Sequence, residues 1–395
     1  MAAIKSIDQL DAKGKRVLVR VDLNTPVKNG VVTDDTRIRA ALHTIQKLVD
    51  EGARVILVSH RGRPSGEGFE EEFSLGPVAR RLQELLDQDI VLSRSLTGPE
   101  AQEVVDALED GDVLLLENIR FDKREKKNDP TFAQELAQLA DAYVNDAFGT
   151  AHRAHASTAG VTEHLPSYAG YLMQKEVSTL TGMLDDPKRP FVAILGGSKV
   201  SDKIKVIDAL LDKADTLIIG GAMCFTFLMA QRMSVGKSLV EEDWVDRAQA
   251  MMKKAKDNDV KLLLPVDVVV AASLSEDAAT EAVSVEDIPA DMMGLDIGPE
   301  TADIYADAIK KAASVFWNGP MGVFEMKPFQ HGTRKVAEAV ANNQQADTII
   351  GGGDSVAAVN LFGLADQMTF ISSGGGASME LVQGEALPGV EALKA

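Results

Sequence analysis

The chain has 395 residues, a length that favours two domains over one. Of these residues, 45% are hydrophobic and 26% are charged, a composition typical of a globular protein. A formal net charge of −19 repels nucleic acid and anionic lipid, so neither is expected as a partner. The first residues lack a signal-peptide pattern, no run approaches the ~20 apolar residues of a membrane helix, and the single cysteine, Cys224, cannot form an internal disulfide.

These features predict a cytoplasmic protein without a membrane partner, with Cys224 buried in an apolar stretch. The excess of acid also means that any anionic substrate must be attracted by a local basic cluster. The positions of a few arginines and histidines therefore become the main question.

In the first half of the chain, short β-branched runs alternate with amphipathic stretches. The predicted strands are residues 16–23, 54–60, 112–118 and 142–146. Helical spacing predicts a helix over 38–49, with Gly52 at its C-terminal cap, and a second helix that begins at Ser74 as its N-cap. Two charge-rich segments, 66–72 and 122–129, are expected to be solvated loops.

The second half repeats this plan, and its predicted strands are residues 191–195, 216–219, 261–266, 314–317, 347–350 and 368–371. These runs are almost continuously apolar, as strands covered on both faces by helices must be. The pattern predicts an α/β protein with two doubly wound, parallel-sheet (Rossmann-like) domains joined by a hinge helix. The expected limits are 1–170 for the first domain, 171–186 for the hinge and 187–380 for the second, with a C-terminal tail, 381–395.

Ligands of open parallel sheets bind beyond the carboxyl ends of the strands. In the first half, polar and basic residues follow four successive strands: Arg20, Asp22 and Asn24; His60, Arg61 and Arg63; Glu117, Asn118 and Arg120; and His152, Arg153 and His155. Arg37, at the start of the first helix, is expected to join them. Guanidinium groups bind planar anions through paired hydrogen bonds, so the pattern predicts a pocket for a phosphate and a carboxylate. A structural network of ion pairs is the alternative.

In the second half, the predicted strand ends carry glycine, which lets backbone N–H groups approach phosphates closely. The glycine-bearing ends are Gly196-Gly197, Gly220-Gly221, Asn318-Gly319, Gly351-Gly352-Gly353 and Gly374-Gly375-Gly376. Five such ends indicate a nucleotide surface. Neither a P-loop nor the dinucleotide fingerprint Gly-x-Gly-x-x-Gly is present, which disfavours a P-loop NTPase and a typical dehydrogenase.

Three charged residues lie beside these glycines. Asp354 is interpreted as the N-cap of a helix, as a ligand of nucleotide-bound Mg²⁺, or as both. Lys199 and Lys203 are four residues apart, which would place them on one face of a helix, where both could contact a moving phosphoryl group.

Nine segments together resemble the phosphoglycerate kinase family, in the order of that family and over essentially the whole chain. They are residues 19–26, 59–64, 116–121, 145–155, 196–203, 294–299, 317–325, 351–355 and 372–378. The resemblance implies phosphoryl transfer between 1,3-bisphosphoglycerate with ADP and 3-phosphoglycerate with ATP, with Mg²⁺ as the cofactor, in a monomer whose two domains close and whose C-terminal tail packs on the first domain.

The resemblance also implies roles for individual residues. The substrate residues are Asp22, Leu23, Asn24, Arg37, His60, Arg61, Gly62, Arg63, Arg120 and Arg153. The nucleotide residues are Lys203, Gly220, Gly221, Gly294, Asn318, Glu325, Gly352, Gly353, Asp354 and Ser355, with Asp354 as the metal ligand. The catalytic residues are Arg37, Lys199, Lys203, Gly374, Gly375 and Gly376.

Four positions depart from the usual family pattern, namely Thr25, Arg61, Ser198 and Cys224, and none removes a group with a chemical role. Since the acceptor would be a carboxylate that is already ionised, no general base is needed, and catalysis must come from alignment and positive charge. Two rival classes remain open at this stage: a two-domain solute-binding protein, which normally carries an export signal, and a dehydrogenase.

Overall fold

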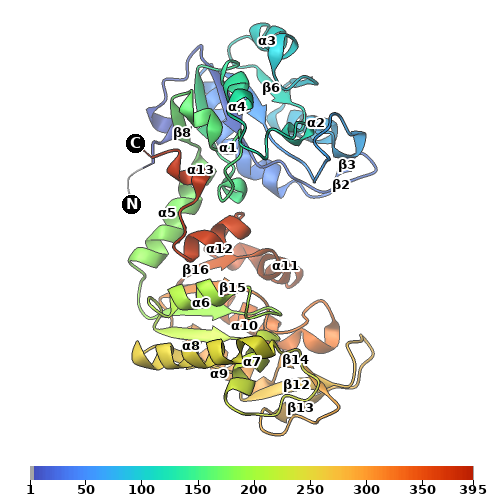
Figure 1. Cartoon of the computed structure of the whole chain (residues 1–395), viewed down its shortest axis with the longest axis vertical. Helices are drawn as coiled ribbons and strands as arrows, with labels where there is room; N and C mark the ends of the chain where they lie inside the picture. Colours follow the sequence, from blue (N-terminus) through green and yellow to red (C-terminus); the bar gives the residue numbers. More distant parts are fainter. Residues whose placement is uncertain (1–3, 395) are drawn as a thin grey trace. The chain divides into compact units, whose positions relative to one another are not determined.

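The computed structural model describes residues 4–394 and shows two compact units (Figure 1). The first unit runs to Thr179 and also includes the C-terminal segment from Ala386, and the second unit is Leu180–Glu385. The first division falls inside α5 (Tyr171–Asp185), at the place where the sequence predicts a hinge helix.

The first unit is built on a six-stranded parallel sheet with the strand order β5-β6-β4-β1-β7-β8. Its strands are β1 (Arg16–Arg20), β4 (Arg54–Val58), β5 (Ile90–Ser93), β6 (Val113–Leu116), β7 (Ala142–Asn145) and β8 (Ser167–Ala169). The four strands predicted from the sequence are the inner ones. The two edge strands, β5 and β8, were not predicted, because they are short and only partly buried.

Helices surround this sheet: α1 (Thr36–Asp50), α2 (Gly76–Leu86), α3 (Gly98–Asp106), α4 (Pro130–Ala137) and α13 (Pro388–Glu391). Short 3₁₀ helices lie in its loops: η1 (Ile7–Gln9), η2 (Glu71–Phe73), η3 (Ile119–Phe121), η4 (Phe148–Thr150) and η5 (Gly160–Glu163). A two-stranded hairpin, β2 (Val27–Lys28) and β3 (Val31–Val32), precedes α1.

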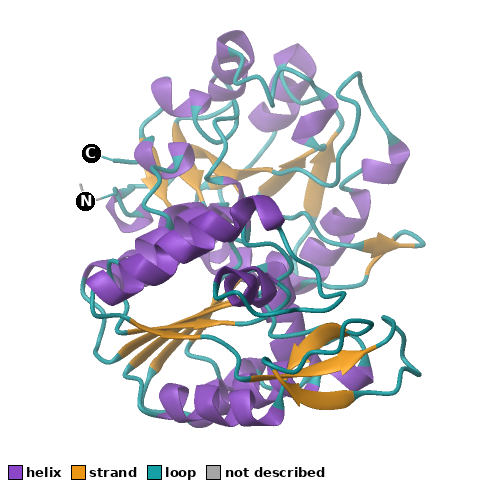
Figure 2. Ribbon diagram, turned by 60° about the horizontal axis from the view of Figure 1, so that its bottom comes forward, coloured by secondary structure: helices purple, strands orange, loops and turns teal. Residues whose placement is uncertain are grey.

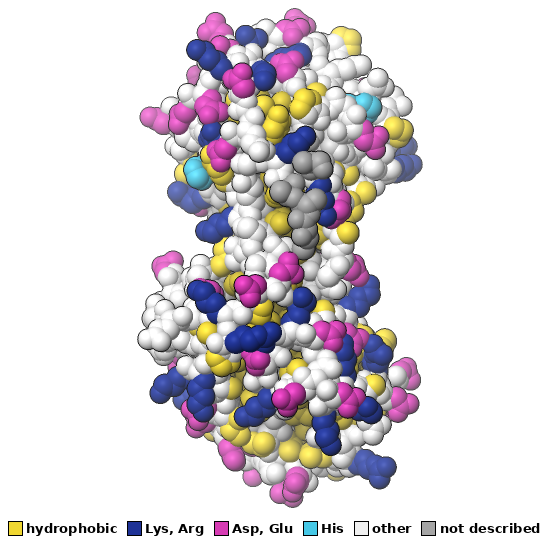
Figure 3. All heavy atoms as spheres, turned by 90° about the vertical axis from the view of Figure 1, so that its left-hand side faces the viewer, with side chains coloured by type: hydrophobic (Ala, Val, Ile, Leu, Met, Phe, Trp, Pro, Cys, Tyr) yellow, Lys and Arg dark blue, Asp and Glu magenta, His cyan; other side chains and the backbone are white. Residues whose placement is uncertain are grey.

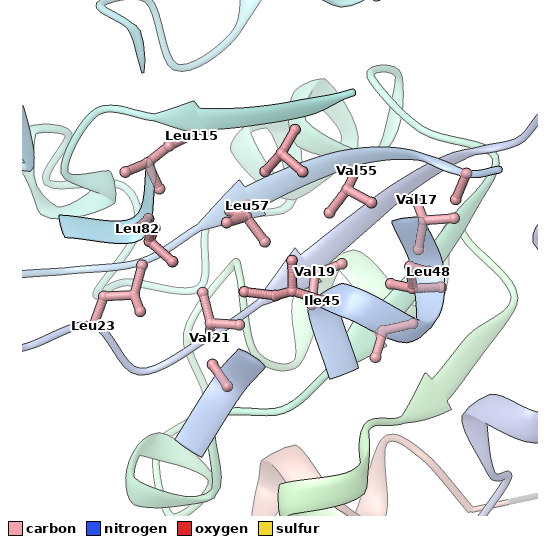
Figure 4. Packing of buried hydrophobic residues seen from close by; sticks show 14 of the residues in the cluster. Val17, Val19, Val21, Leu23, Ile45, Leu48, Val55, Leu57, Leu82 and Leu115 are labelled. Carbon is pink, nitrogen blue, oxygen red and sulfur yellow. The ribbon is translucent and has the colours of Figure 1, made fainter. Parts of the chain in front are cut away.

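The core of the first unit explains why its strands are apolar on both faces. Alternate residues of β1, such as Val17 and Val19, pack with Ile45 and Leu48 of α1 on one face of the sheet (Figure 4). Leu18, between them in the sequence, faces the other way and is also fully buried. Because all its strands are parallel, their carboxyl ends lie at one edge of the sheet, which is where ligands of such sheets bind.

The second unit repeats this design with the strand order β11-β10-β9-β15-β16-β17, again entirely parallel (Figure 2). Its strands are β9 (Phe191–Leu195), β10 (Thr216–Ile219), β11 (Lys261–Leu263), β15 (Ser314–Asn318), β16 (Asp347–Gly351) and β17 (Phe370–Ile371). The helices are α6 (Ile204–Leu210), α7 (Met223–Ala230), α8 (Val245–Asp257), α9 (Pro299–Lys310), α10 (His331–Asn342), α11 (Gly353–Leu361) and α12 (Gly376–Val382), with 3₁₀ turns η6 (Glu242–Trp244), η7 (Lys327–Phe329) and η8 (Ala365–Gln367).

A three-stranded antiparallel sheet in the second unit was not predicted. It consists of β12 (Asp267–Ala271), β13 (Glu281–Ser284) and β14 (Met293–Ile297), with β12 in the middle. In the sequence, β12 continues the apolar run of β11 with only a few residues between them, so periodicity alone does not divide the two strands.

Three predictions about helix ends have different outcomes. Gly52 does follow α1 in a left-handed conformation, with φ 77°. Ser74 is not the N-cap of α2, because Leu75 holds that position, although the Ser74 hydroxyl accepts the N–H of Gly76 at 3.1 Å. Asp354 is not an N-cap either, because Gly352 caps α11 and Asp354 lies inside its first turn.

The C-terminal segment packs within the first unit. The N–H of Lys5 donates to the carbonyl of Leu393 at 3.2 Å, and the N–H of Gly389 donates to the carbonyl of Ala151 at 2.8 Å. Leu387, Val390 and Leu393 are all buried. The chain therefore returns to its first unit after completing the second.

Charge is dispersed over the surface. On the face drawn in Figure 3, acidic and basic side chains are interspersed on both units. Among the described residues, no helix combines the length and the apolar character needed to cross a bilayer.

Candidate active site

The carboxyl ends of β1, β4, β6 and β7 bring the predicted basic residues to one edge of the first sheet, because these strands are parallel neighbours. Arg37, in the first turn of α1, reaches the same edge. Its Nη1 donates to Oδ2 of Asp22 at 2.5 Å. The side chain of Asp22 is 9% exposed and that of Arg37 is 43% exposed, so the pair has one buried and one accessible member.

Asn24 orders the backbone of the loop after β4. Its Oδ1 accepts the N–H of Gly62 at 2.9 Å, and its own N–H donates to Oδ1 of Asp22 at 3.2 Å. Arg120 reaches this loop from η3, because its Nη1 donates to the carbonyl of Gly62 at 3.0 Å. Gly62, in the loop after β4, is thus hydrogen-bonded to Asn24, which follows β1, and to Arg120, which follows β6.

Arg120 carries unused capacity to bind an anion. The residue is 5% exposed, and its Nε is buried without a hydrogen-bond partner. Burial, reinforced by the charges of Arg20 and Arg153, lowers the pKa of Arg120 to about 10. A buried donor without a partner is costly, so an incoming phosphate or carboxylate that accepted the Nε–H would stabilise this group.

His60 is buried at the end of β4, and its Nδ1 lies 3.1 Å from Nη2 of Arg20. Burial and the charges of Arg20, Arg120 and Arg37 hold the pKa of His60 well below its usual value. The imidazole is therefore neutral at physiological pH. A neutral imidazole offers a ligand a hydrogen bond and no positive charge.

The remaining predicted substrate residues differ in whether their side chains are accessible to a ligand. Leu23 is fully buried, and its N–H donates to Oγ of Ser59. The guanidinium of Arg61 is bound to the backbone carbonyls of Ser74 and Glu72. Arg63 and Arg153 are exposed, so they are accessible to a ligand in solution.

One buried acid near this edge contradicts the prediction that segment 122–129 is a solvated loop. Glu125 is fully buried and accepts from both the N–H and the hydroxyl of Ser157, at 2.9 and 2.6 Å. Its neighbours in sequence, Arg124 and Lys126, are partly or fully exposed, so Glu125 is a buried residue between two accessible charged ones. No sequence pattern distinguishes Glu125 from them.

In the second unit, five parallel strand ends carry glycine at one edge of the sheet, as predicted, and two adjoining cavities open there. One, of about 330 Å³, is lined by residues that include Gly197, Lys199, Lys203, Gly352 and Gly375. The other, of about 440 Å³, is lined by residues that include Gly221, Phe225, Gly294, Leu295 and Glu325. Gly197, Ser198 and Asp354 line both.

The first of these cavities has a fixed polar floor. The ammonium group of Lys203 donates to Oδ1 of Asn318, whose Nδ2 donates to the carbonyl of Gly351 at 2.8 Å. Oγ of Ser355 accepts the N–H of Gly319 at 2.6 Å. Burial lowers the pKa of Lys203, while Asp202 and Asp354 oppose that shift.

Lys199 does not lie on a helix with Lys203, contrary to the prediction. Helix α6 begins only at Ile204, and Lys199 lies in the preceding loop, where it is exposed. The two lysines nonetheless line the same cavity, because the chain turns between them after β9.

Glycine is required at Gly352 for two separate reasons. Its φ is 89°, and a Cβ at this position would lie 2.4 Å from Nδ2 of Asn318. Because glycine has no Cβ, the backbone at the start of α11 remains accessible from the cavity. The N-terminal N–H groups of a helix and its dipole favour phosphate there.

The second cavity is the less polar of the two, and its lining includes Phe225, Leu295 and Met321. Gly294 lies against Phe225, since a Cβ on Gly294 would be 2.1 Å from Cζ of that ring. Glu325 is exposed at the lining. Cys224 is buried, as predicted, and burial raises the pKa of its thiol.

Asp354 offers a carboxylate at the place where the two cavities adjoin. Within residues 4–394, no group of three or more His, Cys, Asp or Glu side chains could hold a metal ion. Asp354 is exposed in the first turn of α11, where the two cavities adjoin. Mg²⁺ on phosphates commonly takes only one or two protein carboxylates, which is what this position offers.

A cluster of basic residues at the sheet edge of one doubly wound unit and a glycine-lined pair of cavities on the other fit a kinase of the α/β class, one that uses a small anionic acceptor and a nucleotide. The family model of phosphoglycerate kinase matches residues 7–385. The chain belongs to the phosphoglycerate kinase family.

Individual relatives agree with this assignment over nearly the whole chain. The chain is 54% identical to a phosphoglycerate kinase of Dictyoglomus turgidum, over 97% of this chain and 96% of the relative, and 55% identical to one of Trichodesmium erythraeum, over 99% and 98%. The solved structure from Coxiella burnetii matches with a TM-score of 0.92 at 45% identity over 99% of both chains. That from Pyrococcus horikoshii matches with a TM-score of 0.84 at 32% identity, over 99% of this chain and 98% of the other. The rival classes left open by the sequence, a solute-binding protein and a dehydrogenase, are thereby set aside.

Proposed function

We propose that this kinase transfers a phosphoryl group reversibly between 1,3-bisphosphoglycerate with ADP and 3-phosphoglycerate with ATP, in glycolysis and gluconeogenesis. One observation supports the proposal most directly. The second unit has two adjoining cavities of different chemistry that share Asp354, one suited to phosphates and the other to a nucleoside.

The acceptor belongs to the first unit in this proposal. Arg120, with its unpartnered Nε, and the accessible guanidinium of Arg37 would bind the phosphate and the carboxylate of 3-phosphoglycerate. Asp22 and Asn24 would read the hydroxyl group, and Arg63 and Arg153 would close the pocket from the solvent side. Arg61 is the weakest member of the predicted set, because backbone carbonyls already occupy its guanidinium.

Chemistry in this site requires no general base, because the attacking carboxylate is ionised at neutral pH. The residues that would act on the phosphoryl group in flight are Arg37, Lys199, Lys203 and the N–H groups of Gly374, Gly375 and Gly376. They would stabilise negative charge on the equatorial oxygens. Mg²⁺, held with the nucleotide by Asp354, would supply further positive charge at the phosphates.

A coupled assay tests the proposal. The protein is mixed with 3-phosphoglycerate, MgATP, glyceraldehyde-3-phosphate dehydrogenase and NADH, and the NADH absorbance is followed. A decrease that needs every component, and that stops when EDTA removes Mg²⁺, is expected. Folded protein without any decrease would refute the proposed reaction.

Three finer parts of the proposal have their own tests. In-line transfer on domain closure predicts compaction in small-angle X-ray scattering only when both ligands are bound. A monomer predicts a sedimentation mass near 42.3 kDa. A cytoplasmic location predicts recovery of the activity in the cytosolic fraction of the source cells.

A further inference from the structure

A buried chain of hydrogen bonds runs behind His60 and ends on a carboxylate that touches no accessible part of the site. Arg20, at the end of β1, is fully buried. Its Nη2 lies 3.1 Å from Nδ1 of His60, and its Nε donates to Oγ of Ser157 at 2.9 Å. Ser157 in turn donates its hydroxyl proton to Oε1 of Glu125 at 2.6 Å.

The direction of each hydrogen bond in this chain is fixed by chemistry. Arginine has five N–H donors and no acceptor, so Nδ1 of His60 must be the acceptor and cannot carry a proton. Oγ of Ser157 accepts from Arg20, and therefore its own proton goes to Glu125. Each hydrogen bond in this chain therefore has one possible donor and one possible acceptor. A proton on Nδ1 of His60 would point at an N–H of the Arg20 guanidinium.

We infer that Glu125 is a positioning residue for the kinase reaction, which acts through Ser157 and Arg20 to keep His60 as the neutral tautomer with its proton on Nε2. Nε2–H is then a permanent hydrogen-bond donor for the bound acid. This inference rests on the proposed function for its effect on substrate, although the tautomer itself can be observed without turnover.

The surroundings leave little freedom for another arrangement. Arg20 is held a third time, by the carbonyl of its neighbour Val21 at 2.5 Å. Glu125 also accepts the N–H of Ser157, and the hydroxyl of Tyr143 donates to the carbonyl of Ser157 at 2.7 Å. A fully buried arginine with these partners cannot rotate away from His60 without leaving several buried groups unpaired.

The cationic groups nearest His60 favour the neutral ring. Arg20 on β1, Arg37 on α1 and Arg120 on η3 each lower its pKa, in addition to burial, which is the largest cause. His155 lies 3.7 Å from Oε1 of Glu125, but burial and the nearby arginines lower its pKa to about 4, so it does not compete as a cation.

A neutral hydrogen-bond donor complements the arginines at this edge of the sheet. A histidine that titrated near pH 6.5 would change the charge of the site across the physiological range and would alternate between two donor patterns. A ring locked by Arg20 gives the same donor at every working pH. Burial raises the pKa of Glu125, against the opposing charge of Arg20. Placing this acid behind Ser157 keeps it out of contact with an anionic ligand.

The first experiment observes the tautomer in the wild-type protein. Two-bond ¹⁵N–¹H spectra of protein labelled at the histidine ring nitrogens, with the His60 signals assigned by the His60→Gln variant, should show Nε2–H and an unprotonated Nδ1. This pattern should persist across the physiological pH range, because burial and the neighbouring arginines hold the pKa of His60 well below its usual value. A proton on Nδ1, or titration near pH 6.5, would overturn the inference.

The second experiment breaks the chain of hydrogen bonds at Ser157 and at Glu125. Ser157→Ala and Glu125→Gln should raise KM for 3-phosphoglycerate about tenfold, leave KM for MgATP within about twofold, and give His60 a mixed tautomer. Ser157→Thr keeps the hydroxyl and should retain the single tautomer. An unchanged tautomer and KM in Ser157→Ala would contradict the inference.

Matched controls separate positioning from general damage. Ser93→Ala removes another buried hydroxyl of the same unit, which donates to the carbonyl of Ser95. Glu117→Gln removes another buried carboxylate, which accepts from Ser74 and Leu75. Both should keep the tautomer of His60. If Ser157→Ala fails to fold, the wild-type spectrum still decides the question.

The two proposals can fail separately. Wild-type protein with His60 in the Nε2–H form but without turnover would refute the kinase reaction and leave the tautomer lock standing. Full turnover with a proton on Nδ1 would refute the lock alone.

Discussion

The carboxylate of Asp22 holds the guanidinium of Arg37 at 2.5 Å, although the two residues lie on different elements, the loop after β1 and the first turn of α1. Asp22 is the buried partner and Arg37 the accessible one. This arrangement fixes the direction of a long, flexible side chain and leaves part of its guanidinium free for an anion. Arginine fixed in this way matches the role of a group that meets charge on a transferred phosphoryl group.

Replacing Arg37 with alanine should therefore reduce kcat by roughly 10³-fold, the lower range for a catalytic arginine in phosphoryl transfer. The fold should survive, because the side chain of Arg37 is 43% exposed. Arg39→Ala is the control, since Arg39 lies on the same helix and pairs with Asp35 in solvent. Coupled-assay kinetics on both variants decide the matter, and near-normal kcat in Arg37→Ala would show that its assignment is wrong.

Lys203→Ala should lower kcat by about 10²- to 10³-fold, as expected when one preorganised positive donor is lost from a phosphoryl-transfer site. The ammonium group is partly buried and oriented by Asn318, so a surface lysine cannot replace it. Lys205→Ala is the matched control, because Lys205 lies in the first turn of α6 and pairs with Glu385 at the surface. Equal losses in the two variants would indicate damage to α6 instead of a catalytic role.

Gly352→Ala should weaken nucleotide binding by more than tenfold, because the new Cβ would collide with Nδ2 of Asn318 at 2.4 Å and displace the floor of the phosphate cavity. The backbone conformation of Gly352, φ 89° and ψ 143°, is one that essentially only glycine adopts, so alanine there adds a strain of about 1–3 kcal/mol. Gly363→Ala separates these effects, since Gly363 has φ 69° but no heavy atom within 4 Å of its Cβ position. Isothermal titration with MgADP, together with melting temperatures, should show a lower melting temperature in both variants, with the larger decrease in Gly352→Ala, and lost affinity in Gly352→Ala alone.

Stability should depend on pH through Asp146, which is fully buried and directly follows β7. Burial raises its pKa to about 6 from 3.8, although the N–H of Met173 donates to Oδ1. Because the unfolded chain ionises first, the contribution of Asp146 is complete below pH ~4 and is lost as the pH rises through about 6, a change of ~3 kcal/mol.

Asp146→Asn mimics the protonated acid and should remove this dependence. The free energy of unfolding of the wild type minus that of the variant, from urea titrations, should fall by ~3 kcal/mol between pH 4 and 7. Asp89→Asn, at an exposed position, supplies the reference curve. A difference that stays constant with pH would mean that Asp146 is ionised in the folded protein.

The sequence by itself determined the α/β class, the inner strands of both sheets and the edge on which each site lies. Strands such as 55–58 and 191–195 are apolar throughout, and alternation with amphipathic helices makes a parallel sheet covered on both faces the fold that this pattern favours. Once the strands are parallel, the basic residues after four of them and the glycines after five others must gather at two sheet edges. The motifs for the family are local in sequence, so they could be identified directly.

Only the tertiary structure decided which of these residues are free to bind and which are already committed. Arg61 and Arg63 are two residues apart, yet carbonyls occupy the first and the second is exposed. The sequence does not distinguish Glu125 from the charged residues around it, but Glu125 is fully buried against Ser157, 32 residues further along the chain. Burial and hydrogen bonding between distant segments depend on how loops pack. Because loops follow no hydrophobic period, the sequence carries no signal for the hydrogen-bond chain from Glu125 to His60.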